Sequence, residues 1–135
     1  KGNLKDYSGA IDDFNKAIEI NPKFANAYFN RGNVKIISKD YSRAIDDFNK
    51  AIEINPKFAN AYAVRGEAKS NLKDYSGAID DYSKAIEINP KFAYAYSSRG
   101  VVKKIIGDRE AACSDWREAS KLGNKKSAKW VQEAC

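Results

Sequence analysis

The sequence predicts an all-α fold, a solenoid of stacked antiparallel helix pairs closed by a C-terminal capping helix. One segment occurs three times with few changes, beginning at Tyr7, Tyr41 and Tyr75. Each copy carries a proline in the same Asn-Pro-Lys-Phe setting, and the even spacing of Pro22, Pro56 and Pro90 defines the period of the repeat. A period of this size indicates a stacked array, because one helix pair cannot bury its apolar face alone.

The expected domain covers residues 1–135 and has five parts. These are a partial repeat at 1–22, complete repeats at 23–56, 57–90 and 91–124, and a capping helix at 125–135. The partial repeat is mainly a second helix, at about 8–20, because the chain begins at Lys1, the counterpart of Lys35. Its apolar stripe should be partly exposed, so either further repeats precede Lys1 or another copy of the chain covers this edge.

The second helix of a repeat is the more clearly marked one. Its apolar residues lie at i, i+3, i+4, i+7, i+10 and i+11, one stripe of a helix of period 3.6; in the first complete repeat they are Tyr41, Ala44, Ile45, Phe48, Ala51 and Ile52. The first helix is expected at about 25–38. Each first helix contains a glycine, at residue 32, 66 or 100. Glycine destabilises a helix by about 1 kcal/mol relative to alanine, so its recurrence indicates that helices approach closely there and that a Cβ would block the contact.

The same seven positions recur in successive repeats and resemble the tetratricopeptide repeat (TPR) family. They are Tyr28, Gly32, Tyr41, Ala44, Phe48, Ala51 and Pro56, and then Tyr62, Gly66, Tyr75, Ala78, Tyr82, Ala85 and Pro90. The resemblance implies a right-handed solenoid and a protein-protein interaction scaffold without enzymatic activity. The fourth repeat departs from the pattern, with Arg109 for Tyr and Asn124 for Pro.

The resemblance also implies a concave groove, lined by the first helices, that holds an extended peptide or a partner's helix. The groove positions it assigns are Asn26, Phe29, Asn30, Asn33, Ile37, Asn60, Ala63, Val64, Glu67, Asn71, Tyr94, Ser97, Ser98, Val101 and Ile105. Asparagine both donates and accepts hydrogen bonds, which suits a peptide backbone, and Phe29 and Tyr94 are candidate apolar anchors. The alternative is that these asparagines only keep an exposed surface soluble.

Some co-chaperones of this family hold a C-terminal carboxylate in a clamp of five residues. Asn33 fits one of its positions. The other four are occupied by Phe29, Val64, Tyr94 and Ser98 in place of Lys, Asn, Lys and Arg. The sequence therefore argues against a receptor for chaperone tails.

An arginine at residue 31, 65 or 99 stands where the family usually has an apolar residue. An aspartate follows each arginine sixteen residues later, on the facing helix. We expect three ion pairs, Arg31–Asp47, Arg65–Asp81 and Arg99–Asp115, each holding the two helices of a repeat in register.

Cys113 and Cys135 are the only cysteines, and each is eleven residues from Asn124, where the chain should turn between two antiparallel helices. Ser120 and Ala128 are small enough to permit close approach, so a disulfide is expected. It would favour a periplasmic or other extracytoplasmic location, after loss of an upstream signal peptide, whereas two reduced thiols would favour the cytoplasm.

Composition argues against other functions. The chain has no histidine, the commonest general base and metal ligand, and its paired acids repeat with the scaffold. We expect no catalytic activity, cofactor, metal ion or membrane insertion.

The net charge of +6 attracts acidic partners, but the groove positions hold no row of Lys or Arg, so nucleic acid is a weaker candidate than a protein or peptide. A spacer or assembly module that self-associates through the N-terminal edge is the main alternative.

Overall fold

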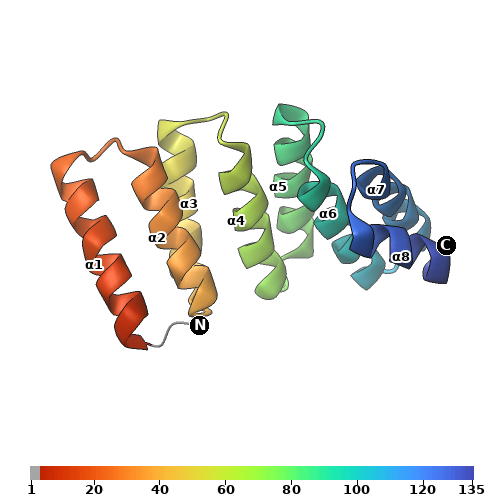
Figure 1. Ribbon diagram of the computed structural model, residues 1–135, viewed down its shortest axis with the longest axis horizontal. Helices are drawn as coiled ribbons and strands as arrows, with labels where there is room; N and C mark the ends of the chain where they lie inside the picture. Colours follow the sequence, from red (N-terminus) through yellow and green to blue (C-terminus); the bar gives the residue numbers. More distant parts are fainter. Residues whose placement is uncertain (1–3) are drawn as a thin grey trace.

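The structure is a computed structural model that describes residues 4–135. Over that range the chain forms eight helices and no strand (Figure 1). The helices are α1 (Leu4–Ile20), α2 (Ala25–Ile37), α3 (Tyr41–Ile54), α4 (Ala59–Asn71), α5 (Tyr75–Ile88), α6 (Ala93–Ile105), α7 (Arg109–Lys121) and α8 (Lys125–Ala134). None of them is both long and apolar enough to cross a membrane.

Each helix packs against the next one along the chain, so the helices follow one another from α1 at the left of Figure 1 to α7 and α8 at the right. The closest pairs are α2 with α3, α4 with α5 and α6 with α7. The first helices of successive pairs also contact one another, α2 with α4 and α4 with α6. They therefore lie side by side on one face, here called the inner face. This arrangement is the expected all-α solenoid.

The links within the helix pairs are tight turns with a defined backbone. Lys39 and Lys73 adopt positive φ angles of 65° and 68°, and Gly107 takes this place in the last pair with a φ of 95°. The aspartate that follows begins the next helix, and the side chains of Asp74 and Asp108 accept hydrogen bonds from backbone N–H groups of the first turn. Capping of this kind satisfies donors that the helix itself leaves free.

A large ring from the second helix fills the centre of each pair. Phe48, Tyr82 and Trp116 occupy the same repeat position and are almost fully buried. Each lies against the glycine of the first helix, where an added Cβ would come within 2.5–3.0 Å of a ring atom. The close approach expected from these glycines is therefore present.

Helix α1 differs from the expectation, because it begins at Leu4 instead of near residue 8. In two of the complete repeats the equivalent residues form the turn with a lysine at positive φ, Lys39 or Lys73, a conformation that costs a non-glycine residue free energy. No described helix precedes α1 for the chain to turn away from, so the helix simply continues. Residues 1–3 of the expected partial repeat lie outside the described residues.

The apolar stripe of α1 is partly exposed, as expected. Ala10, Phe14 and Ala17 are half-buried, whereas their counterparts one repeat later are fully buried in the core. Within the described part of the chain, the helix that packs against α1 is α2.

Helix α8 begins two residues earlier than the repeat period predicts. The step from Arg109 to Lys125, the first residues of α7 and α8, is shorter than the equivalent step from Tyr75 to Ala93, because α7 and the link after it each lack one residue. Ser127 therefore takes the fully buried place held by Ala95 in the preceding repeat, and its hydroxyl has no hydrogen-bond partner among the described residues. The expectation that Ala128 packs against α7 is wrong, since Ala128 is exposed.

Candidate peptide-binding groove

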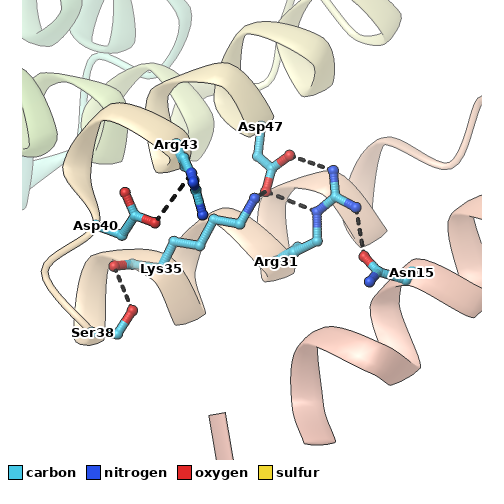
Figure 2. Close-up of polar contacts among 7 residues, drawn as sticks. All are labelled: Asn15, Arg31, Lys35, Ser38, Asp40, Arg43 and Asp47. Atoms are coloured by element: carbon cyan, nitrogen blue, oxygen red, sulfur yellow. Dashed lines mark hydrogen bonds and ion pairs between the residues drawn. The ribbon is translucent and has the colours of Figure 1, made fainter. Parts of the chain in front are cut away.

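An arginine fixes the position of each inner helix. In α2 the Nε and Nη2 atoms of Arg31 donate hydrogen bonds of 2.9 and 2.6 Å to the two carboxylate oxygens of Asp47 in α3 (Figure 2). The Asp47 side chain is only 5% exposed. Its hydrogen bond raises the pKa of the Arg31 guanidinium above the ordinary value, although burial opposes the change. The pair is bidentate and partly desolvated, the geometry that gives such pairs directional strength.

The same pair is repeated in the other two complete repeats. Arg65 binds Asp81 at 2.8 and 2.7 Å, and Arg99 binds Asp115 at 2.9 and 2.7 Å. The three expected ion pairs are thus all present. The aspartates that precede Asp47 and Asp81 are not buried, so only one acid of each adjacent pair faces the arginine.

Three further contacts of the ion pair, two through the arginine and one through the aspartate, were not expected from the sequence. Lys35 adds an ion pair of 3.0 Å to Asp47, and Nη1 of Arg31 donates to Asn15 of the preceding repeat at 2.7 Å (Figure 2). The ring of Tyr28 lies 5.5 Å from the guanidinium carbon. The corresponding contacts in the next repeats involve Lys69, Tyr62 and Asn49, and then Lys103, Tyr96 and Ser83. The sequence did contain a signal for these contacts, because the lysine, the tyrosine and the asparagine or serine recur around each arginine with the period of the repeat. Each guanidinium therefore connects three helices.

The assigned groove residues divide into three groups by exposure. Exposed are Asn30, Asn60, Asn71, Ile37, Tyr94, Ile105 and Asn26; half-buried are Phe29, Asn33, Val64, Glu67, Ser98 and Val101; buried are Ala63 and Ser97. The assignment of Ala63 and Ser97 to the groove is wrong, because their repeat position points toward the neighbouring helices. Phe29 shares this position, and its ring packs 5.9 Å from Phe48 and 4.8 Å from Phe58. Phe29 therefore contributes to helix packing as well as to the surface.

A small hollow of about 270 Å³ lies between α4 and α6. It brings together four of the assigned residues, Glu67, Tyr94, Ser98 and Val101. The hydroxyl of Tyr94 donates to Glu67 Oε1 at 2.6 Å, and its ring meets that of Tyr82 edge-on at 6.5 Å. The hydrogen bond crosses from one inner helix to the next, so it fixes the width of the groove at this point.

A larger hollow, of about 690 Å³, lies between α6 and the capping helix, and is here called the cap hollow. Its lining residues are Val101, Lys104, Ile105, Arg109, Trp116, Trp130, Glu133 and Ala134. Trp130 packs 5.1 Å from Trp116. Trp130 was not expected on the inner face, because the regular period aligns it with Tyr96. The two-residue shift of α8 aligns it with Ser98, and the short link after α7 was the signal.

Comparison with known proteins identifies the family of the repeats. A tetratricopeptide repeat model matches residues 25–58 and 59–92, and a TPR repeat model matches residues 3–36. The chain belongs to the tetratricopeptide repeat family. No curated protein is similar enough to the chain to count as a match.

Solved structures with this fold include other TPR proteins. The crystal structure of MamA is 29% identical with a TM-score of 0.82, and the match covers 90% of this chain and 71% of that one. The TPR domain of Arabidopsis OM64 is 28% identical with a TM-score of 0.77, covering 81% and 91%. The first TPR of Spaghetti (RPAP3), bound to the HSP90 peptide SRMEEVD, is 24% identical with a TM-score of 0.77, covering 82% and 89%, and this likeness shows the fold alone.

The last TPR helix pair is joined to the capping helix by its cysteines. The structure places Cys113 and Cys135 in a disulfide with a Cα–Cα separation of 5.9 Å. Cys113 is buried in a cluster with Ala112 and Trp116, and Trp130, Val131 and Ala134 pack against this cluster. The bond therefore holds the end of α8 beside the cap hollow.

Chemistry other than binding has little support in this TPR array. TPR repeat proteins are in general scaffolds without enzymatic activity. Within residues 4–135 no group of three His, Cys, Asp or Glu side chains is placed to hold a metal ion. The acids with buried carboxylates, Asp47, Asp81 and Asp115, are engaged in the ion pairs that hold the helices together.

Proposed function

We propose that this chain is a protein-interaction scaffold that binds an extended segment of a partner along the inner face of α2, α4 and α6. The observation that carries the proposal is a contrast between two kinds of position. The residues of the ion pairs and the core glycine are the same in all three complete repeats. The surface positions change, as in the series Asn33, Glu67 and Val101. A purely structural surface has no need of such variation.

The chemistry of the inner face suits a peptide. The exposed amides of Asn26, Asn30 and Asn60 offer donors and acceptors to a main chain that needs both. Apolar side chains lie at both ends of this surface, with Ile37 at the end of α2 and Val101 and Ile105 in α6. A segment with a polar backbone contact region and apolar side chains toward its ends would match this arrangement.

A free C-terminal carboxylate is not required under this proposal. The same fold holds the peptide SRMEEVD in Spaghetti, but the clamp positions of this chain offer no basic side chain, since they carry Phe29, Asn33, Val64, Tyr94 and Ser98. An internal segment of a partner therefore fits better than a chain end.

A peptide library with free and amidated C-termini tests this function. The expected result is binding to internal sequences that amidation leaves unchanged, and a clear loss of affinity in the double variant Asn26→Ala, Asn60→Ala. The matched control is Asp46→Ala, Asp80→Ala, which changes two residues on the second helices. Affinity that disappears on amidation, or that falls equally in the control, would contradict the proposal. Retention from lysate that nuclease abolishes would favour nucleic acid instead.

Self-association through α1 is a second candidate. The half-buried stripe of Ala10, Phe14 and Ala17 favours it, because an uncovered apolar face seeks a partner surface. Asp13 is exposed, whereas its counterparts in the later repeats are buried beneath an arginine. Sedimentation equilibrium of the protein and of Phe14→Glu tests this function: a dimer that the variant dissociates supports it, and a monomeric wild type at high micromolar concentration excludes it.

A further inference from the structure

The cap hollow, with about 690 Å³, has more than twice the volume of the hollow between α4 and α6, with about 270 Å³. We propose that it binds an aromatic side chain of a partner segment and that acidic residues flank this side chain in the partner. This inference rests on the proposed scaffold function and specifies the partner of that same surface.

The walls of the hollow are apolar and open. Ile105 is 54% exposed, Val101 and Trp130 are half-buried, and Trp116 is almost fully buried. A volume of about 690 Å³ lies within the range of about 300–1,000 Å³ typical of ligand pockets. An exposed apolar surface of this kind gains free energy when an apolar group covers it.

The hollow between α4 and α6 shows how a side chain of the chain itself can fill a space of this kind. Between α4 and α6, the ring of Tyr94 packs on Tyr82 and its hydroxyl is held by Glu67, which leaves only about 270 Å³. One repeat later the counterpart of Glu67 is Val101, and the counterpart of Tyr94 in the shifted register of α8 is Lys126. These two side chains cannot form the bridging hydrogen bond. In the preceding repeat an aromatic side chain, Tyr94, fills this space. In the cap hollow no aromatic residue of the described chain takes the equivalent place.

The charges at the rim select the residues next to that aromatic group. Lys104 and Arg109 are exposed, and neither forms an ion pair with a side chain that the structure describes. Glu133 is the only acid among the lining residues. Residues 99–135 carry nine basic and five acidic residues, a net charge of +4. Carboxylates beside the aromatic group would therefore be attracted to the rim and would approach faster.

The hollow is held open by the attachment of the capping helix. Ala134 lines it, and the next residue, Cys135, is bonded to Cys113 in α7. The wall formed by α8 is thereby fixed before a partner arrives, which lowers the entropy lost on binding.

The chain carries its own reporter for the test. Its only two tryptophans, Trp116 and Trp130, both line the hollow. The oxidised protein is titrated with the tryptophan-free peptide acetyl-Ser-Glu-Glu-Phe-Glu-Ser-amide while tryptophan fluorescence is recorded. We expect a saturable change, at least tenfold weaker binding when Phe is replaced by Ala in the peptide, and a similar loss when its three Glu are replaced by Lys.

Variants that copy a residue from the equivalent position of another repeat can locate the site. Each introduced side chain already occurs at that position in this fold. Ile105→Asn and Lys104→Ser introduce the side chains found at the same place in α4, Asn71 and Ser70. Each should weaken binding by fivefold or more. The matched control is Ile106→Ser, which borrows Ser38; Ile106 is 53% exposed but does not line the hollow. Circular dichroism melts verify that the variants are folded.

Each outcome decides the inference. Absence of a saturable signal, equal binding of the lysine peptide, or an affinity that Ile105→Asn leaves unchanged would overturn it. The scaffold function fails separately, when library peptides show no binding that depends on Asn26 and Asn60. A library peptide that binds through those asparagines while fluorescence stays constant would retain the scaffold and reject the cap hollow as its anchor site.

Discussion

The hydroxyl of Tyr94 donates a hydrogen bond to Glu67, in the preceding repeat, and so links α6 to α4. The side chain of Tyr94 is 38% exposed overall, but its hydroxyl lies against Glu67 between α4 and α6. Removal of this hydroxyl from water raises the pKa of Tyr94 above its ordinary range, and the hydrogen bond to Glu67 raises it further. Burial also raises the pKa of Tyr82, and the nearby charge of Glu67 adds to the effect. Both phenols are therefore neutral in the folded protein over a wider range of pH than in the unfolded chain.

This difference predicts a loss of stability in alkali. Below about pH 10 both tyrosines are protonated whether the chain is folded or not, so they add no pH dependence. Above it, the unfolded chain releases two protons that the folded protein retains, and the free energy of unfolding falls as pH rises. Urea unfolding from neutral to strongly alkaline pH should show this fall, and Tyr94→Phe and Tyr82→Phe should each reduce its slope. A slope that both variants leave unchanged would contradict the assignment.

Removal of one arginine should destabilise the array strongly. Arg65→Ala leaves the buried Asp81 carboxylate with Lys69 as its remaining cation, and we expect a loss of about 2–4 kcal/mol, since breaking a buried pair strands a charge. The double variant Arg65→Leu, Asp81→Leu should recover much of the loss, because both charges are removed. Urea unfolding of the two variants is the measurement; a double variant no more stable than the single one would show that the pair contributes by packing alone.

Replacing glycine by alanine should destabilise the protein in α6 and stabilise it in α1. At Gly100 an added Cβ would lie 2.5 Å from Trp116 Nε1 and 3.1 Å from the carbonyl oxygen of Ala112, so Gly100→Ala should be destabilising. At Gly9 nothing lies within 4 Å of the added atom, and Gly9→Ala should stabilise the protein by up to about 1 kcal/mol through helix propensity. Thermal melts decide between the two signs, and a stable Gly100→Ala would mean that the indole moves aside freely.

The cysteine pair gives a prediction about stability and compartment. We propose that the disulfide forms in solution and that the parent protein works in an oxidising compartment. Cys135→Ser should lower the free energy of unfolding by roughly 3 kcal/mol, the value for closing a loop of this length, and should leave the melt insensitive to reductant. Mass spectrometry after alkylation of the unreduced protein is the direct check: two modified thiols after isolation under oxidising conditions would end both proposals.

Much of this fold could be predicted from the sequence, because a contact inferred in one repeat is expected at the equivalent positions of the other repeats. Once the period was known, the spacing of sixteen between Arg31 and Asp47 predicted three ion pairs that the structure contains. Where the period fails, so does the reasoning. The short link before α8, which lacks proline, was the only sign of a shifted register, and the copies themselves did not show that Ser127 would be buried and Ala128 exposed.

The groove was predicted less completely than the scaffold. Its positions came from a family resemblance, which does not tell whether a side chain of a given size remains on the surface. Ala63 and Ser97 are small and lie beneath their neighbours, whereas Phe29 at the same repeat position is large enough to reach the surface. The cap hollow depends on the register of α8, so it became visible only in the structure.

The arginines have a consequence for how the array unfolds. The Nη1 atom of Arg65 reaches Asn49 in the preceding repeat, while its other two nitrogens bind Asp81 in its own. One side chain thus adds to the stability of a repeat and also to the coupling energy between neighbouring repeats. In a one-dimensional array the ratio of these two terms sets the cooperativity. Arrays whose repeats are joined in this way should melt as one unit, whereas loss of the Nη1 contacts alone would let single repeats fray from the ends.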